Sequence, residues 1–150
     1  MQELLVTVTI VLVGLMVGVE LSVAAFVEPI FSRLPPAAGI AARSDGARVL
    51  GRVMPFWYIG CVLLGVIWAA LTWGHPQVLL IAAALALLLL SVVMSITVLV
   101  PINTRVARWA REGTPEDWQQ QVRRWNVFHY ARVGLIVAAF VLLVLAGLTA

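Results

Sequence analysis

Four long apolar stretches, separated by polar segments, dominate the pattern of residues along the chain. They cover residues 4–27, 55–73, 78–100 and 127–148. Because a helix needs about 20 largely apolar residues to cross the hydrocarbon core of a bilayer, each stretch is long enough to span a membrane. The pattern therefore predicts an all-α fold, a polytopic membrane four-helix bundle that occupies residues 1–150 as a single domain.

The composition agrees with this prediction. The chain is 63% hydrophobic and 11% charged, and its mean hydropathy is +1.04. A soluble domain of this length could not bury so much apolar surface. The single cysteine, Cys61, falls inside the second stretch, so it can form no disulfide within the chain and is expected to be a packed core residue.

Positive charge is concentrated in two of the three connections between the spans. The positive-inside rule places both of these connections, predicted as long loops after the first and third helices, in the cytoplasm, and both termini outside. The net charge of +3 then indicates contact with anionic lipid headgroups, and no nucleic-acid partner is expected. The arginines of the two connections are Arg33, Arg43, Arg48 and Arg52, and Arg105, Arg108, Arg111, Arg123 and Arg124.

Prolines and capping residues predict where the helices begin and end. We expect Pro29 and Pro101 to end the first and third spans. Residues 37–53 are expected to form a short helix lying on the membrane surface, and residues 102–109 a second short helix. The run Thr114-Pro115-Glu116-Asp117 predicts the start of a long fourth helix. One stripe at helical spacing follows along that helix: Trp118, Val122, Trp125, His129 and Arg132.

Several polar residues in or beside the spans need an explanation, because an ionisable side chain within a span usually faces the bundle interior. At about 1.5 Å of rise per helical residue, Glu20 lies deepest and within reach of Arg132. Four others share one layer near the cytoplasmic boundary, with Tyr58 close to it: Glu28, Asn103, His129 and Arg132. The four helices are therefore predicted to converge on one polar cavity that opens to the cytoplasm.

Each of these residues also has an ordinary structural role open to it. Glu20 and Arg132 could form an inert ion pair that fixes the register of two helices. Asn103 could cap a helix, Glu28 could be an interfacial acid, and His129 could be an interface residue whose polar atoms are satisfied. The tryptophans could be membrane anchors. Convergence at one depth, from different helices, favours a functional site.

The sequence carries no strong signal for a cofactor. It has no cysteine pair, no glycine-rich phosphate loop and no HExxH run. If a metal is present, Glu20, Glu28 and His129 are the candidate ligands, since carboxylate and imidazole suit iron, copper or zinc. We therefore expect either no cofactor or a single transition metal.

The region from the third to the fourth span carries a recognisable set of motifs. It contains Val100-Pro-Ile-Asn-Thr-Arg105, then Trp118, then Trp125-x3-His129-x2-Arg132, and the first span ends in Glu28-Pro29. Together these resemble the anthrone oxygenase-like membrane proteins over essentially the whole chain. Most members of that family are bacterial, so the resemblance implies a multi-pass protein of a bacterial inner membrane.

The resemblance implies oxidation of a hydrophobic aromatic or polyketide-type carbon by O2 as co-substrate, without flavin or haem. Asn103, His129 and Arg132 are the positions that match the family motif, and Glu20 is added because its burial is costly. In this interpretation His129 is the base, and Arg132 and Asn103 hold the enolate oxygen. An apolar slot for the flat substrate would be lined by Trp57, Tyr58 and Trp125, with Glu28 beside it.

Two further hypotheses remain open. A small proton-coupled transporter would use Glu20 as its exchanging acid. A non-enzymatic accessory or structural subunit would bind a protein partner in place of a substrate. The small residues Gly14, Gly18 and Ser22 form a row that could serve packing within the bundle or the seam of a homo-oligomer.

Overall fold

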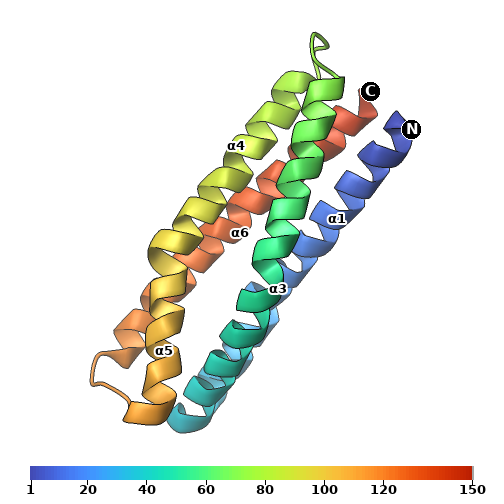
Figure 1. Cartoon of the computed structure of the whole chain (residues 1–150). Coiled ribbons are helices and arrows are strands. Elements are labelled where there is room, and N and C mark those ends of the chain that lie inside the picture. Colours follow the sequence, from blue (N-terminus) through green and yellow to red (C-terminus); the bar gives the residue numbers. More distant parts are fainter. Residues whose placement is uncertain (150) are drawn as a thin grey trace.

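The chain folds into four long helical rods that run side by side (Figure 1). The computed structural model describes residues 1–149, and of residues 110 and 111 only the backbone, so the side chain of Arg111 lies outside the described residues. The α-helical elements are α1 (Gln2–Ser22), α2 (Glu28–Arg33), α3 (Pro36–Leu71), α4 (Val78–Met94), α5 (Val100–Glu112) and α6 (Trp118–Leu148).

All four rods are long and apolar enough to cross a membrane, and the described residues contain no strand. The rods run over Gln2–Arg33, Pro36–Leu71, Val78–Trp109 and Trp118–Leu148. The predicted all-α bundle of four membrane helices is thus confirmed. Both termini lie at one end of the bundle and the arginine-rich turns lie at the other (Figure 1). The orientation of these ends in the membrane stays a prediction.

The long cytoplasmic loops predicted after the first and third spans are not confirmed, because both segments are helical. The short helices predicted over residues 37–53 and 102–109 are present, but each continues the rod of a span. Residues 36–54 are the first part of α3, and residues 100–112 form α5. Pro36 is tolerated because it stands in the first turn of its helix. Gly39 is required where α3 crosses α2, since a Cβ there would lie 2.8 Å from the carbonyl oxygen of Phe31. Tertiary packing here outweighs the low helix propensity of glycine.

The prolines expected to end the first and third spans do not end them. Each follows a short π-helix, η1 (Val23–Val27) before Pro29 and η2 (Ser95–Leu99) before Pro101. A proline inside an α-helix lacks an N–H and its ring clashes with the carbonyl four residues earlier. The wider π turn relieves that conflict, and the rod continues beyond it.

The start of the fourth helix is later than predicted. Residues 115–117 form a turn, in which the carbonyl of Pro115 accepts a hydrogen bond from the amide of Trp118 at 3.3 Å, and α6 begins at Trp118. The predicted stripe along α6 is confirmed. Val122, His129 and Arg132 are buried. Trp118 and Trp125 pack against the apolar cluster through which α3 contacts α5.

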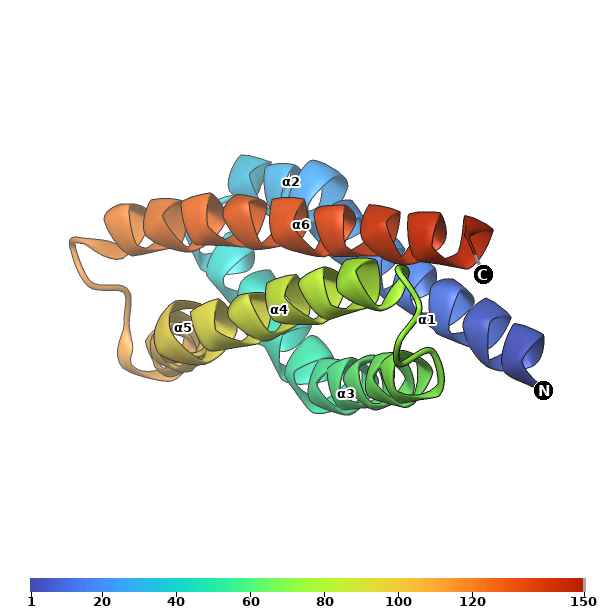
Figure 2. The ribbon, with the colours of Figure 1, turned by 90° about the horizontal axis from the view of Figure 1, so that it is seen from above.

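The packed core occupies the half of the bundle that contains the termini. α6 packs most extensively on α4 and also contacts α1, as Figure 2 shows from above. Gly14 of the small-residue row faces Phe140 of α6, so this position serves packing within the bundle. The largest side chains of this core come from all four rods: Val13, Met16, Trp68, Ile81, Leu88, Ile136 and Leu143.

Candidate functional site

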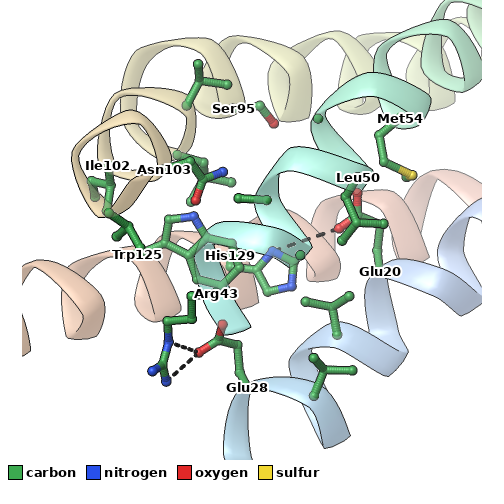
Figure 3. A pocket seen from close by; sticks show the side chains of 18 of the residues that line it. Glu20, Glu28, Arg43, Leu50, Met54, Ser95, Ile102, Asn103, Trp125 and His129 are labelled. Atoms are coloured by element: carbon green, nitrogen blue, oxygen red, sulfur yellow. Dashed lines mark hydrogen bonds and ion pairs between the residues drawn. The ribbon is translucent and has the colours of Figure 1, made fainter. Parts of the chain in front are cut away.

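A cavity of about 160 Å³ lies in the arginine-rich half of the bundle. A single water needs only about 10–15 Å³ of such space, so the cavity has room for a much larger ligand. Both π-helical turns contribute to its wall, and Figure 3 shows how its side chains converge. Its polar lining residues are Glu20, Glu28, Arg43, Ser95, Asn103, His129 and Arg132, set among apolar residues that include Leu50, Met54, Ile102 and Trp125.

The deepest polar group is an ion pair between Glu20 and Arg132. Arg132 Nη2 donates to Glu20 Oε2, and its Nη1 donates to Ser95 Oγ at 3.0 Å. The guanidinium also lies 5.8 Å from the centre of the Tyr58 ring. Arg132 therefore connects α6 to α1, to η2 and to α3; Glu20 was predicted to lie deeper and within its reach, Tyr58 near its layer, and Ser95 was not predicted.

His129 lies beside this ion pair. Its Nδ1 is 3.4 Å from Arg132 Nη2 and 3.9 Å from Glu20 Oε2. Its ring stacks on the indole of Trp125, with 4.5 Å between centroids and 19° between planes. Because a guanidinium has only donors, the contact with Arg132 favours an unprotonated Nδ1. The imidazole is thus held rigidly with a proton-accepting nitrogen next to a carboxylate.

A second ion pair, between Glu28 and Arg43, closes the cavity toward the turn that joins α2 to α3. Arg43 Nε donates to Glu28 Oε2 at 3.1 Å, and Arg43 Nη2 lies 3.1 Å from the same oxygen and donates to Ser32 Oγ at 2.9 Å. Arg43 was predicted only as a topological arginine, so its role in the site was missed. A signal was available, because Glu28 and Arg43 lie at similar distances on either side of the helix break at residues 34–35.

Asn103 differs from the other polar residues of the cavity. Its side chain is half-buried and forms no hydrogen bond with the described residues. Figure 3 shows it at the cavity wall, close to Trp125 and His129. In contrast, both carboxylates of the cavity are paired with arginines. The Asn103 amide is therefore free to bind a ligand, and so is His129 Nε2, which is buried and has no hydrogen-bond partner among the described residues.

Two of the predicted substrate contacts do not line the cavity. The indole N–H of Trp57 donates to the carbonyl of Leu12 at 3.1 Å, outside the cavity. Tyr58 is buried beside the Arg132 guanidinium, and its hydroxyl has no hydrogen-bond partner among the described residues. Tyr58 thus supports Arg132 from behind and Trp57 belongs to the packed core, whereas Trp125 and Glu28 face the cavity as predicted.

The candidate metal ligands are not brought together as one set. Glu20 and His129 are neighbours, but Glu28 is held by Arg43. Among residues 1–149, no group of three or more His, Cys, Asp or Glu side chains has an arrangement that could hold a metal ion. The donors present therefore do not fit the three-ligand site that the sequence offered.

The comparisons with known proteins are brief. A family model described as anthrone oxygenase matches residues 46–142. This stretch starts within α3 and ends within α6, so it contains Asn103, Trp125, His129 and Arg132. No curated protein and no solved structure matches the chain.

Proposed function

Since the chain belongs to the anthrone oxygenase family, we propose that it is a membrane enzyme that oxidises a hydrophobic aromatic or polyketide-type substrate with O2 inside this cavity. The observation that carries the proposal is the chemical character of the cavity. Glu20 is paired with Arg132 and Glu28 with Arg43, so the buried charges sum to zero and the remaining lining is mostly apolar. Such a cavity suits a neutral substrate.

The proposed reaction begins with the removal of a proton from an activated ring carbon. His129 accepts this proton, and the Glu20 carboxylate, whose Oε2 lies 3.9 Å from the imidazole Nδ1, offsets the positive charge that develops on the ring. The Asn103 amide donates to the enolate oxygen of the substrate. The Arg132 guanidinium favours the same negative charge from the floor of the cavity. Trp125 keeps the imidazole in place by stacking on it.

The carbanion then reacts with O2 directly. One electron passes from the carbon to O2, the two radicals combine to form a carbon–oxygen bond, and the proton returns to give a hydroperoxide. Loss of water from the hydroperoxide leaves a ketone, so a ring CH2 and one O2 yield one C=O and one H2O. The protein supplies a base, hydrogen-bond donors and an apolar site, and the substrate itself is the reductant.

The contacts of Glu20 favour this enzyme over the transporter hypothesis. A proton-exchanging acid has to release its partner during each cycle. Glu20 is instead buried, paired with Arg132 and next to His129. We further propose that the protein resides in a bacterial inner membrane, with the cavity on the cytoplasmic side and membrane lipids as its surroundings.

The direct test is oxygen uptake by the purified protein in lipid nanodiscs, with anthrone as the probe substrate. We expect one ketone per O2, at a rate well above the spontaneous oxidation of anthrone. The variant His129→Ala should lose roughly 10²–10⁴-fold of that rate, the usual contribution of a general base. His75→Ala, in the exposed turn between α3 and α4, is the matched control and should keep full activity.

Two other results would redirect the assignment. Iron, copper or zinc bound near one per chain, and lost in His129→Ala, would replace direct oxidation by a metal-dependent route. No turnover of anthrone or related ring ketones, together with stable co-purification of another protein, would favour the accessory-subunit hypothesis.

A further inference from the structure

The wall that α3 presents to the cavity contains an unusual share of small residues. Arg43, Ala47, Leu50 and Met54 form a stripe at helical spacing that faces the cavity, flanked by the glycines at positions 46 and 51. At 100° per residue these two glycines fall on opposite flanks of the stripe. The missing side chains leave space on each side of it.

The two glycines face different neighbours. A Cβ on Gly46 would meet Phe31 of α2 at 3.8 Å, so this flank is turned toward α2. Gly51 lies three helical turns from Ile40, and Ile40 packs on Ile102 and Val106 of α5. The flank that carries Gly51 is therefore turned toward α5.

The cavity has its exposed edge on that same flank. Among its lining residues, Gly51 and Val100 are exposed, with Val100 52% accessible, whereas the others are buried or half-buried. Both residues line the same cavity, one from α3 and the other from the start of α5. No atom lies within 4 Å of a Cβ built on Gly51. The cavity is thus open between α3 and the start of α5.

The surroundings of this opening indicate where it lies in a membrane. Exposed apolar side chains stand on the side of the termini, namely Val53, Phe56 and Ile96. Exposed Arg48 and Arg52 stand next to Gly51 on α3. Apolar side chains belong against acyl chains, and arginines belong among headgroups. The opening therefore lies at the boundary between the acyl chains and the headgroups, where flat amphipathic molecules collect.

The opposite side of the cavity is closed. A shallow groove lies outside it, toward the ends of α2 and α6, and the two hollows share Phe31, Arg43 and Val122 as a common wall. Arg43 is held in that wall by Glu28 and Ser32. A molecule that entered by way of this groove would have to pass Arg43.

We propose that the gap between Gly51 and Val100 is a lateral entrance through which a membrane-dissolved substrate reaches the cavity, and that Gly51 determines how broad that substrate can be. The proposal rests on the proposed function for the identity of the substrate. The entrance itself can be tested without any turnover, because it predicts which reagents reach the cavity.

The test uses a cysteine placed in the cavity, Met54→Cys, in a chain whose own cysteine is replaced by Cys61→Ala. The reagents are N-phenylmaleimide, which is neutral and dissolves in the bilayer, and a quaternary-ammonium methanethiosulfonate, which does not. We expect the maleimide to react readily and the charged reagent slowly. Adding Gly51→Leu should slow the maleimide about tenfold, because the new side chain fills the path into a concave site.

Gly134→Leu is the matched control, since Gly134 is also an exposed helical glycine with nothing within 4 Å of its Cβ and lies outside the cavity. It should leave the labelling rate unchanged. Equal maleimide rates with and without Gly51→Leu would overturn the entrance, and the oxygenase assignment would stand. If the charged reagent reacted as fast as the maleimide while Arg43 is unchanged, access would come from the aqueous side, and this would overturn the entrance too.

If the entrance is confirmed and the enzyme is active, Gly51→Leu should also change substrate preference. Its kcat/KM should fall more for three-ring substrates than for single-ring substrates, while Gly51→Ala stays close to wild type. A uniform loss for all substrates would contradict a role of Gly51 in specificity. If neither the wild type nor any variant oxidised a substrate, the proposed function would be wrong. The labelling result would still test the entrance, because it needs no turnover.

Discussion

The two halves of the bundle are built from the same four rods but differ in the regularity of the helices and in the contacts between them. In the half with the termini, helices are regular α and their contacts are apolar, as with Ile81, Ile136 and Leu143. In the arginine-rich half both π-helical turns occur, two buried acids are paired with arginines, and a cavity separates the helices.

This difference indicates a division of roles. Helices that lie in lipid gain little from hydrophobic burial, so close packing and satisfied polar groups must hold them together. The first half provides that packing, and it lets the second half keep an open, polar interior. Buried ion pairs contribute little net stability but fix the positions of the helices that carry them. We therefore expect damage in the two halves to have different consequences.

The largest effect on stability should come from Arg132→Met. It leaves Glu20 buried without its partner, and breaking a buried pair in this way costs about 3–5 kcal/mol. Thermal unfolding in detergent, followed by circular dichroism, measures the loss. The double variant Glu20→Gln with Arg132→Met should recover most of it, since no uncompensated charge remains. A double variant as unstable as the single one would show that the charge pairing is not the cause.

Ile136→Ala should have the next largest effect and should act on stability alone. Ile136 is fully buried in the packed half, and truncation of such a residue typically costs about 2–5 kcal/mol through lost contacts and a cavity. Val141→Ala, on the exposed face of the same helix, is the control and should cost far less. If Ile136→Ala lowered oxygen uptake per folded molecule as strongly as stability, the division of roles would be wrong.

Ser95→Ala should have the smallest effect on stability, about 0.5–1.5 kcal/mol for one hydrogen bond. Its informative consequence is functional, because Ser95 Oγ orients Arg132 Nη1 from the π-helical turn. We expect a lower kcat with anthrone and little change in KM. Thr97→Ala, on the exposed side of the same turn, should change neither.

The sequence predicted the spans and most of the cavity because both follow from spacing. His129 and Arg132 lie on one helical stripe with Trp125, and their depth matched that of Glu28 and Asn103. The sequence could not distinguish Arg43 from the arginines that set topology. An arginine that lines a pocket and one that contacts lipid headgroups both occur in the connections between spans. Pro29 and Pro101 were misinterpreted as helix ends. Residue helix propensities do not predict a π-helical turn that accommodates a proline.

The most direct test of the account compares oxygen uptake with anthrone, per folded molecule, in Asn103→Ala and Ile136→Ala. Asn103 lines the cavity without a hydrogen-bond partner among the described residues, so its loss should lower uptake roughly tenfold or more without lowering the unfolding temperature. Ile136→Ala should lower the unfolding temperature and retain the uptake of its folded fraction. The contrary result, with full uptake in Asn103→Ala and uptake lost in folded Ile136→Ala, would contradict the placement of the chemistry in the arginine-rich half.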